Sequence, residues 1–295
     1  MKKIVTALVL FSLLYSCQPK RESGEKPMIS VSILPQKYFV EQLAGELVDV
    51  NVLIPPGASP ATYEPTISQL GKLENSELYL RIGHIGFELS WMEKITEVNP
   101  EMEIVDLSRG VELIYEDEGQ DEHHDHSHEG HSHGGTDPHL WLSVENARII
   151  SQNLHEALLV IFPENEEELK ARLTNFKTSL DSLQQTIDNR LDALEQRSFL
   201  IYHPALTYFS KEYDLHQYSL EIEGKNPSPA HMREMIDLGQ ELNISLILIQ
   251  EQFDRKNAEV LAKEIGADIL AFDPLDPQWM EQMLYIADLF NSSKP

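Results

Sequence analysis

The chain has 295 residues, of which 41% are hydrophobic and 24% charged, and its formal net charge is −26. This length and composition are ordinary for a globular protein with one large domain or two lobes. The strong negative charge argues against a nucleic-acid partner and favours a cationic ligand, although acidity also serves solubility alone.

The first seventeen residues have the pattern of an export signal. Lys2 and Lys3 form a basic start, and an apolar run follows at Ile4–Leu14. About eleven apolar residues are too few to cross a bilayer core of about 30 Å, which predicts a signal peptide rather than a membrane helix. Cys17, the only cysteine, follows a Leu-Tyr-Ser sequence that resembles a bacterial lipobox, in which the cysteine is acylated and becomes the mature N-terminus. The alternative is an ordinary signal peptide with a stray cysteine.

Residues 18–27 are polar and rich in helix breakers, and we expect them to form a flexible tether. A single cysteine cannot form a disulfide within the chain, even in an oxidising compartment. We therefore expect the mature protein outside the cytoplasm, held by its lipid to a membrane in the periplasm or on the outer cell face.

From Met28 onwards, short β-like runs alternate with helical stretches. The expected strands are Ile29–Leu34, Val48–Ile54, Glu77–Gly83, Met102–Leu107, Ser198–His203, Leu215–Leu220, Ser245–Gln250 and Ala267–Phe272. The expected helices among them are Pro35–Gly45, Pro65–Ser76, Pro229–Leu242 and Lys256–Ile265. Such alternation predicts an α/β fold with two lobes, each a mainly parallel sheet flanked by helices.

One long helix is expected between the lobes. Apolar residues recur at spacings of three and four throughout Pro163–Leu194, glutamates fill the first turn, and no Gly or Pro interrupts the later turns. Such a helix would be about 45 Å long. It could form a coiled-coil dimer seam, but we favour a stiff strut along both lobes. The expected division is an N-terminal metal-binding lobe at 28–162, a linking helix at 163–196 and a C-terminal metal-binding lobe at 197–295.

A histidine-rich loop is expected at 121–135. Seven of the twelve histidines fall between Asp121 and His139, interleaved with Asp, Glu and Gly. Imidazole ligands suit Zn²⁺, Cu²⁺ and Ni²⁺. The alternatives are a solvated linker or a purification tag, but the run is internal, irregular and mixed with carboxylates. His155 and His231 fall within helical patterns, and we expect both at the surface.

Side chains able to bind metal follow several expected strands. His84, Glu251 and Asp273 each come directly after an expected strand, His203 stands at the end of one, and His139 ends the histidine-rich region. Ligands of open parallel sheets bind beyond the carboxyl ends of the strands. Three histidines and a carboxylate converging from two lobes would form a four-coordinate site suited to zinc.

Six short motifs occur in order along the chain. They are Pro55–Thr66 (PPGASPATYEPT), Asp137–Ser143 (DPHLWLS), Tyr202–Phe209 (YHPALTYF), Glu223–Pro229 (EGKNPSP), Ile249–Phe253 (IQEQF) and Phe272–Leu275 (FDPL). With these motifs, residues 28–292 resemble the zinc/manganese solute-binding lipoproteins of ABC uptake systems (cluster A-I metal receptors), especially the zinc-uptake branch with a histidine-rich loop. The resemblance implies two lobes joined by a rigid helix, with metal held between them and delivered to a membrane permease.

The resemblance also implies metal ligands. His139 matches the histidine of the D-P-H-x-W motif, His203 that of H-x-x-x-x-Y-F, and Asp273 the aspartate after the last strand. A histidine at position 203 makes the donor set rich in nitrogen and favours zinc, whereas manganese favours carboxylate oxygen. Glu251 is expected to orient a ligating imidazole or to join the lobes.

The first ligand of the family is missing. The family pattern P-H-x-Y-E-P places a histidine where this chain has Ala61. We expect His84 to replace it, because His84 follows an N-lobe strand and should face the same cleft. Water, Glu64 or a histidine of the loop could instead complete the site, with His84 only forming hydrogen bonds.

The leading interpretation is a monomeric zinc receptor, not an enzyme, that captures Zn(II) and passes it to an ABC permease. A manganese or other divalent-metal receptor of the same family is the first alternative. A secreted zinc hydrolase would need an open coordination position and a base such as Glu251, but the chain has no H-E-x-x-H motif. An adhesion or sensory lipoprotein would share the site and differ only in its partners.

Overall fold

The computed structural model describes residues 26–115, 135–222 and 224–292. Two four-stranded parallel sheets form the framework, and they have the same strand order, β2-β1-β3-β4 and β6-β5-β7-β8. The first sheet consists of β1 (Met28–Val31), β2 (Asp49–Val52), β3 (Ser76–Arg81) and β4 (Glu103–Asp106). The second consists of β5 (Ser198–Ile201), β6 (His216–Ser219), β7 (Leu246–Gln250) and β8 (Asp268–Phe272). The expected α/β fold with two parallel sheets is confirmed.

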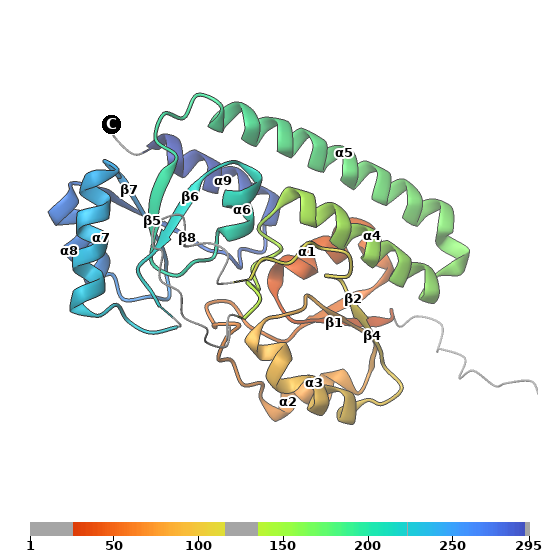
Figure 1. The fold of residues 1–295 in the computed structure, drawn as a ribbon. Helices are drawn as coiled ribbons and strands as arrows, with labels where there is room; N and C mark the ends of the chain where they lie inside the picture. Colours follow the sequence, from red (N-terminus) through yellow and green to blue (C-terminus); the bar gives the residue numbers. More distant parts are fainter. Residues whose placement is uncertain (1–25, 116–134, 223, 293–295) are drawn as a thin grey trace, which may run out of the picture.

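Helices connect the strands and cover the sheets (Figure 1). In the first half they are α1 (Leu34–Ala44), α2 (Ile67–Leu73), α3 (Gly86–Val98) and α4 (Val144–Ile161). The second half contains α6 (Thr207–Glu212), α7 (Pro229–Glu241), α8 (Lys256–Ile265) and α9 (Trp279–Ser292). Short 3-10 turns occur at Gly45–Leu47 and Pro163–Asn165. The central strand β7 is buried at all five positions, as a parallel strand covered on both faces should be.

The long helix α5 (Glu166–Leu191) runs alongside α4 and α9 (Figure 1). Its 26 residues correspond to about 39 Å. The expected helix began earlier, but Pro163 opens a 3-10 turn instead. Apolar side chains on one face, including Leu169, Leu180 and Ile187, are fully buried against the rest of the chain. The helix thus packs along both halves, as expected, and its buried apolar stripe is not free to form a coiled-coil seam.

The hydrophobic core continues from one sheet to the other. Helix α9 follows the last strand of the second sheet, yet its Trp279 ring lies 5.0 Å from the Phe39 ring of α1, centroid to centroid. Phe39 also contacts Phe176 of α5 at 6.0 Å. These aromatic contacts tie the C-terminal helix to the N-terminal half of the molecule.

Helix α4 lies against both α1 and α5. His155 of α4 is therefore buried, with 8% of its surface exposed, and the expectation that it lies at the surface is wrong. Burial lowers the pKa of His155, and the nearby Lys177 ammonium lowers it further. His231 is partly buried, with its Nε2 3.1 Å from the Ser219 carbonyl oxygen.

Three expected features lie outside the described residues. They are the signal peptide with Cys17, nearly all of the tether, and residues 121–134 of the histidine-rich loop. Among the residues that are described, no helix combines the length and apolar character needed to cross a membrane.

Candidate metal centre

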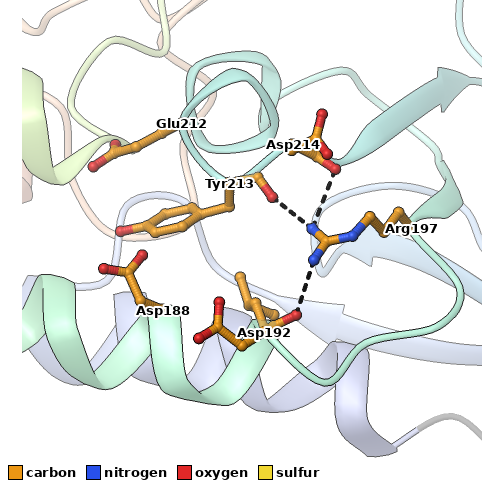
Figure 2. A pocket seen from close by; sticks show the side chains of 7 residues that line it. Asp188, Asp192, Arg197, Glu212, Tyr213 and Asp214 are labelled. Carbon is orange, nitrogen blue, oxygen red and sulfur yellow. Dashed lines mark hydrogen bonds between the residues drawn. The ribbon is translucent and has the colours of Figure 1, made fainter.

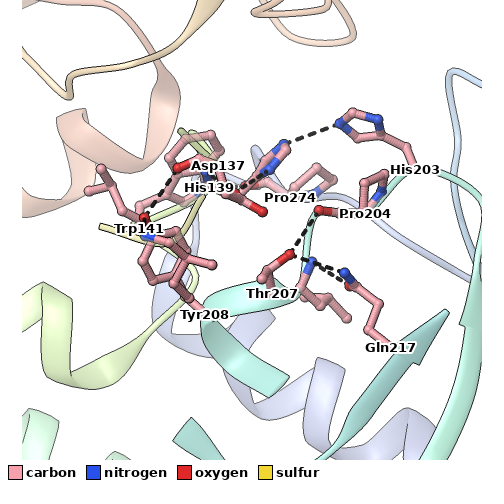
Figure 3. A network of polar contacts seen from close by, with 12 residues as sticks. Asp137, His139, Trp141, His203, Pro204, Thr207, Tyr208, Gln217 and Pro274 are labelled. Carbon is pink, nitrogen blue, oxygen red and sulfur yellow. Dashed lines mark hydrogen bonds and ion pairs between the residues drawn. The ribbon is translucent and has the colours of Figure 1, made fainter. Parts of the chain in front are cut away.

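His139 and His203 face each other across the junction of the two halves of the molecule. Their Nε2 atoms are 3.3 Å apart, and the rings are inclined at 75° (Figure 3). His203 follows β5 by two residues, and His139 lies in the loop that leads into α4. Both side chains are partly buried. The strand-end argument thus placed His203 at the position where parallel sheets bind ligands.

Each histidine has a carboxylate on its other ring nitrogen. The Nδ1 atom of His139 is 3.1 Å from Oδ1 of Asp137, and the Nδ1 atom of His203 is 3.1 Å from Oε2 of Glu221. A carboxylate can only accept a hydrogen bond, so each Nδ1 atom carries a hydrogen and donates the hydrogen bond. In a neutral ring this tautomer leaves Nε2 as a lone-pair nitrogen, which is the arrangement found in metal-binding histidines.

Two lone-pair nitrogens that face each other repel unless a cation lies between them. Nitrogens bound to one tetrahedral zinc ion at about 2.0–2.1 Å lie about 3.3–3.4 Å apart. The observed 3.3 Å separation of the His139 and His203 Nε2 atoms matches this geometry. The pair can therefore supply two adjacent corners of a tetrahedral site.

The environment of the pair keeps the rings in place. The His203 ring stacks on Phe253 at 5.5 Å, and the His139 ring lies 5.4 Å from Trp141. Burial by itself would raise the pKa of Asp137, but the His139 side chain and backbone N–H lower it overall. Asp137 is thus held as a carboxylate able to orient His139.

Asp273 follows β8 and is partly buried. Its Oδ1 accepts a hydrogen bond from the Leu275 N–H at 2.8 Å. Burial raises the pKa of Asp273, and the carboxylates of Asp276 and Glu251 raise it further. A nearby cation would relieve this crowding of negative charge.

His84 lies in a turn after β3 and has a φ of 64°, which is unusual for a residue other than glycine. The buried Glu88 carboxylate fixes this turn by accepting from the N–H groups of Ile82 and Gly83 at 2.9 and 2.7 Å. Burial lowers the pKa of the partly buried His84 imidazole. A mainly neutral imidazole is the form that binds metal.

The loop that carries Ala61 packs on the segment just after His84. The Phe87 N–H donates to the Pro60 carbonyl at 2.8 Å, and a Cβ at Gly86 would lie 2.6 Å from the Ala61 oxygen. Position 61 and the His84 turn are therefore neighbours, as a replacement of one ligand by the other requires.

The full set of expected ligands is not assembled. Within residues 26–115, 135–222 and 224–292, no group of three or more His, Cys, Asp or Glu side chains is placed to hold one metal ion. The structure brings His139 and His203 together and does not join Asp273 or His84 to them. The side chains of Glu64 and Glu251 are exposed.

Comparison with known proteins gives the family. The sequence model of the family described as "Zinc-uptake complex component A periplasmic" (ZnuA) matches residues 29–290. The chain belongs to this family. It is 26% identical over 284 residues to the zinc-binding lipoprotein AdcA of Streptococcus pneumoniae (strain ATCC BAA-255 / R6), an alignment that covers 94% of this chain and 56% of AdcA. The chain thus spans little more than half the length of that relative.

Other relatives match over their whole length. A putative metal-binding protein of Chlamydia trachomatis serovar D is 27% identical over 293 residues, covering 96% of this chain and 97% of the relative. A crystal structure of ZnuA has a TM-score of 0.82 and 33% identity, covering 90% of this chain and 99% of that chain. A zinc-bound ZnuA deletion mutant has a TM-score of 0.81 at 33% identity, with coverage of 92% and 99%.

The two carboxylates beside the Nδ1 atoms of His139 and His203 were not among the residues expected at the site. Glu221 follows β6 by two residues, so the strand-end rule would have found it had it been applied to every strand. Asp137 is the first residue of the DPHLW motif that supplies His139. The proposed orienting residue, Glu251, lies instead near Asp273.

A separate pocket of about 250 Å³ lies where α5 ends and β5 begins (Figure 2). Its lining consists of Asp188, Leu191, Asp192, Arg197, Glu212, Tyr213 and Asp214. Arg197 donates to the backbone carbonyls of Leu191, Tyr213 and Asp214. This guanidinium fastens the end of the long helix to the second sheet, and none of the expected metal ligands lines the pocket.

Proposed function

We propose that the protein is an extracytoplasmic receptor that captures Zn(II) and delivers it to an ABC permease. The observation that carries the proposal is the 3.3 Å separation of the His139 and His203 Nε2 atoms, with a carboxylate beside the Nδ1 atom of each ring. Membership of the zinc-uptake family supports the same function. The similarity to the zinc-binding lipoprotein AdcA and to the zinc-bound ZnuA structure supports zinc as the cargo.

We infer that Asp273 and His84 complete the site when metal binds. Three imidazoles and one carboxylate are a donor set that zinc accepts readily, whereas manganese prefers oxygen ligands. The crowded negative charge at Asp273 and the neutral form favoured at His84 support their roles. Water, Glu64 or a histidine of the 121–135 loop are the alternatives for the position of His84.

The protein's own residues would control capture and release. Asp137 and Glu221 orient the imidazoles, and the stiff helix α5 limits how far the halves can separate. Capture and release would follow from a difference in zinc affinity between the closed form and the form bound to the permease, and no chemical step is needed. The receptor is therefore proposed not to be an enzyme.

The receptor is proposed to be a lipid-anchored monomer. Acylation of Cys17 would hold it to a membrane, and the covered apolar face of α5 supports a monomeric state. Adjacency of its gene to genes for a permease and an ATPase would support transport over an adhesion or sensory role.

Isothermal titration calorimetry of the mature protein tests the proposal. We expect zinc to bind at one tight site, with manganese at least tenfold weaker. His139→Ala and His203→Ala should each weaken zinc binding about hundredfold or more, equivalent to about 2.7 kcal/mol. His216→Ala, which removes an exposed histidine of β6, is the matched control and should bind zinc as the wild type does. Wild-type affinity in both ligand variants would exclude this site.

A further inference from the structure

Two buried tryptophans bind each other's loops near the histidine pair. The Trp141 indole N–H donates to the Pro274 carbonyl at 2.8 Å, and the Trp279 indole N–H donates to the Trp141 carbonyl at 2.7 Å. Both side chains are 1% exposed. Trp141 is two residues from His139, and Pro274 is one residue from Asp273. Figure 3 shows Trp141, Pro274 and the two histidines around one junction.

Further hydrogen bonds join the same loop to α6. The Tyr208 hydroxyl donates to the Asp137 carbonyl at 3.2 Å. The Glu212 carboxylate accepts from the N–H groups of Val144 and Glu145 at 2.9 and 3.2 Å. The segment that carries His139 precedes α5 in sequence, but it is thus fastened at both ends and in its middle to the C-terminal half.

One contact of this segment with the N-terminal half also involves Tyr208 of α6. The Asp137 N–H donates to the Ile114 carbonyl at 2.8 Å, but the Ile114 N–H in turn donates to the Tyr208 hydroxyl at 3.2 Å. The loop after β4 is therefore itself held by α6. His84, by contrast, lies in a turn fixed by Glu88 and the strand end of the first sheet.

We propose that Trp141 and Trp279 form a clasp that fastens the loop of His139 to the loop of Asp273, so that His139, His203 and Asp273 keep their mutual positions before metal binds. The identity of these ligands rests on the proposed function. Trp141 and Trp279 act through the loops that they hold, and neither is itself a ligand.

The clasp suits this role for two physical reasons. Each link between loop and ligand spans only one or two residues, so little backbone freedom separates the hydrogen bond from the metal-binding atom. Both hydrogen bonds are buried, where water cannot replace a lost partner. Ligands that are held in place before binding lose less conformational entropy on binding, which raises affinity.

The test removes each indole N–H and keeps an aromatic ring. Trp141→Phe and Trp279→Phe are compared with Trp91→Phe, which changes the remaining tryptophan, on α3. Each clasp variant should bind zinc about three- to tenfold more weakly, while the control stays within about twofold of wild type. The absorption spectrum of bound Co(II), which reports ligand geometry, should change in both clasp variants and not in the control.

The Co(II) spectrum separates positioning from stability. A variant that is only less stable, but folded by circular dichroism, would give the wild-type spectrum at saturating cobalt, and this result would overturn the clasp. If either tryptophan variant does not fold, Tyr208→Phe replaces it, because it removes the hydroxyl contact with the Asp137 carbonyl. Wild type and His203→Ala are measured in parallel. If wild type does not bind zinc, the proposed function and the clasp are both overturned. If zinc affinity and the Co(II) spectrum are unchanged in the clasp variants while His203→Ala binds zinc weakly, only the clasp is overturned.

Discussion

The two sheets share one strand order, but the carboxyl ends of their strands differ in use. In the first sheet, the fully buried Glu88 occupies this end and accepts hydrogen bonds from the Ser32 hydroxyl and from the N–H groups of Ile82 and Gly83. In the second sheet, His203 occupies the equivalent end and directs Nε2 towards His139. The strand ends of the first sheet thus surround one of the chain's own carboxylates, whereas those of the second direct an imidazole nitrogen towards His139.

This difference explains why topology locates a site without assigning its ligands. Both sheets offer the crevice at which parallel folds bind ligands. In the first sheet, Glu88 at this edge stabilises the turn that contains His84 with its positive φ. In the second sheet, Glu221 at this edge accepts a hydrogen bond from the His203 imidazole. The strand ends of the N-terminal half thus fix a turn, whereas those of the C-terminal half direct an imidazole nitrogen towards the junction.

The largest expected effect concerns Glu88. Burial raises its pKa to about 7, although hydrogen bonds from Ser32, Ile82 and Gly83 oppose the shift. A carboxyl whose pKa is raised on folding stabilises the protein below its unfolded pKa of about 4.5, and this stability is lost as pH rises to about 7. The loss should be about 3 kcal/mol over this range. Urea unfolding of wild type and Glu88→Gln between these pH values measures it, and the difference between the two proteins should vary with pH by that amount.

A pH-independent difference between wild type and Glu88→Gln would show that Glu88 titrates normally. Zinc affinity at pH 7 provides the second comparison. Because Glu88 holds the His84 turn and contacts neither His139 nor His203, the variant should retain a cobalt or zinc complex with weakened affinity. Complete loss of binding would contradict the division of roles between the two sheets.

The second effect concerns Glu221, the carboxylate partner of His203. Glu221→Gln keeps the shape of the side chain and removes its charge, so the imidazole loses basicity and orientation. Zinc affinity should fall about 10- to 100-fold. The matched control is Glu264→Gln, which changes an exposed glutamate of α8 and should leave affinity within about twofold. Equal losses in both variants would indicate a general effect of negative charge on zinc attraction.

The third effect tests the replacement of the missing family histidine. His84→Ala should weaken zinc binding at least tenfold, or about 1.4 kcal/mol. Ala61→His in the same chain should restore part of the loss, because the loop of Ala61 packs directly on the segment after His84. Full affinity in His84→Ala would instead support water or a carboxylate as the fourth ligand.

Much of the fold could be predicted because strands and helices leave local periodic patterns. The expected strand Ser245–Gln250 and the observed β7 at Leu246–Gln250 differ by one residue. The packing partners of those elements could not be predicted, since periodicity identifies an apolar face but not what covers it. His155 shows the consequence, because its helix is covered by α5 from a later part of the sequence.

The site shows the same limit. His139 and His203 could be proposed from motifs and strand ends, but their Nε2 distance depends on contacts between distant segments. The hydrogen bond of Trp141 to Pro274 joins residues 133 positions apart, and no local sequence pattern predicts it. Glu88 was not predicted for the same reason: its partner Ser32 lies 56 residues away. Residues close to a motif or a strand end were therefore accessible from sequence, whereas the long-range hydrogen bonds of Trp141 and Glu88 were not.

The smallest expected effect on the tight site comes from the histidine-rich loop. Deletion of Asp121–Gly135 removes six histidines and leaves His139, His203 and their carboxylate partners unchanged. A segment that mixes imidazoles with glycine should bind additional zinc weakly, because the backbone freedom of glycine is lost when the segment is ordered around a metal. Calorimetry should therefore show loss of the weak equivalents and a tight affinity within about twofold of wild type. Loss of the tight site on deletion would mean that a loop histidine, rather than His84, is the fourth zinc ligand. In that case His84→Ala would not change zinc affinity.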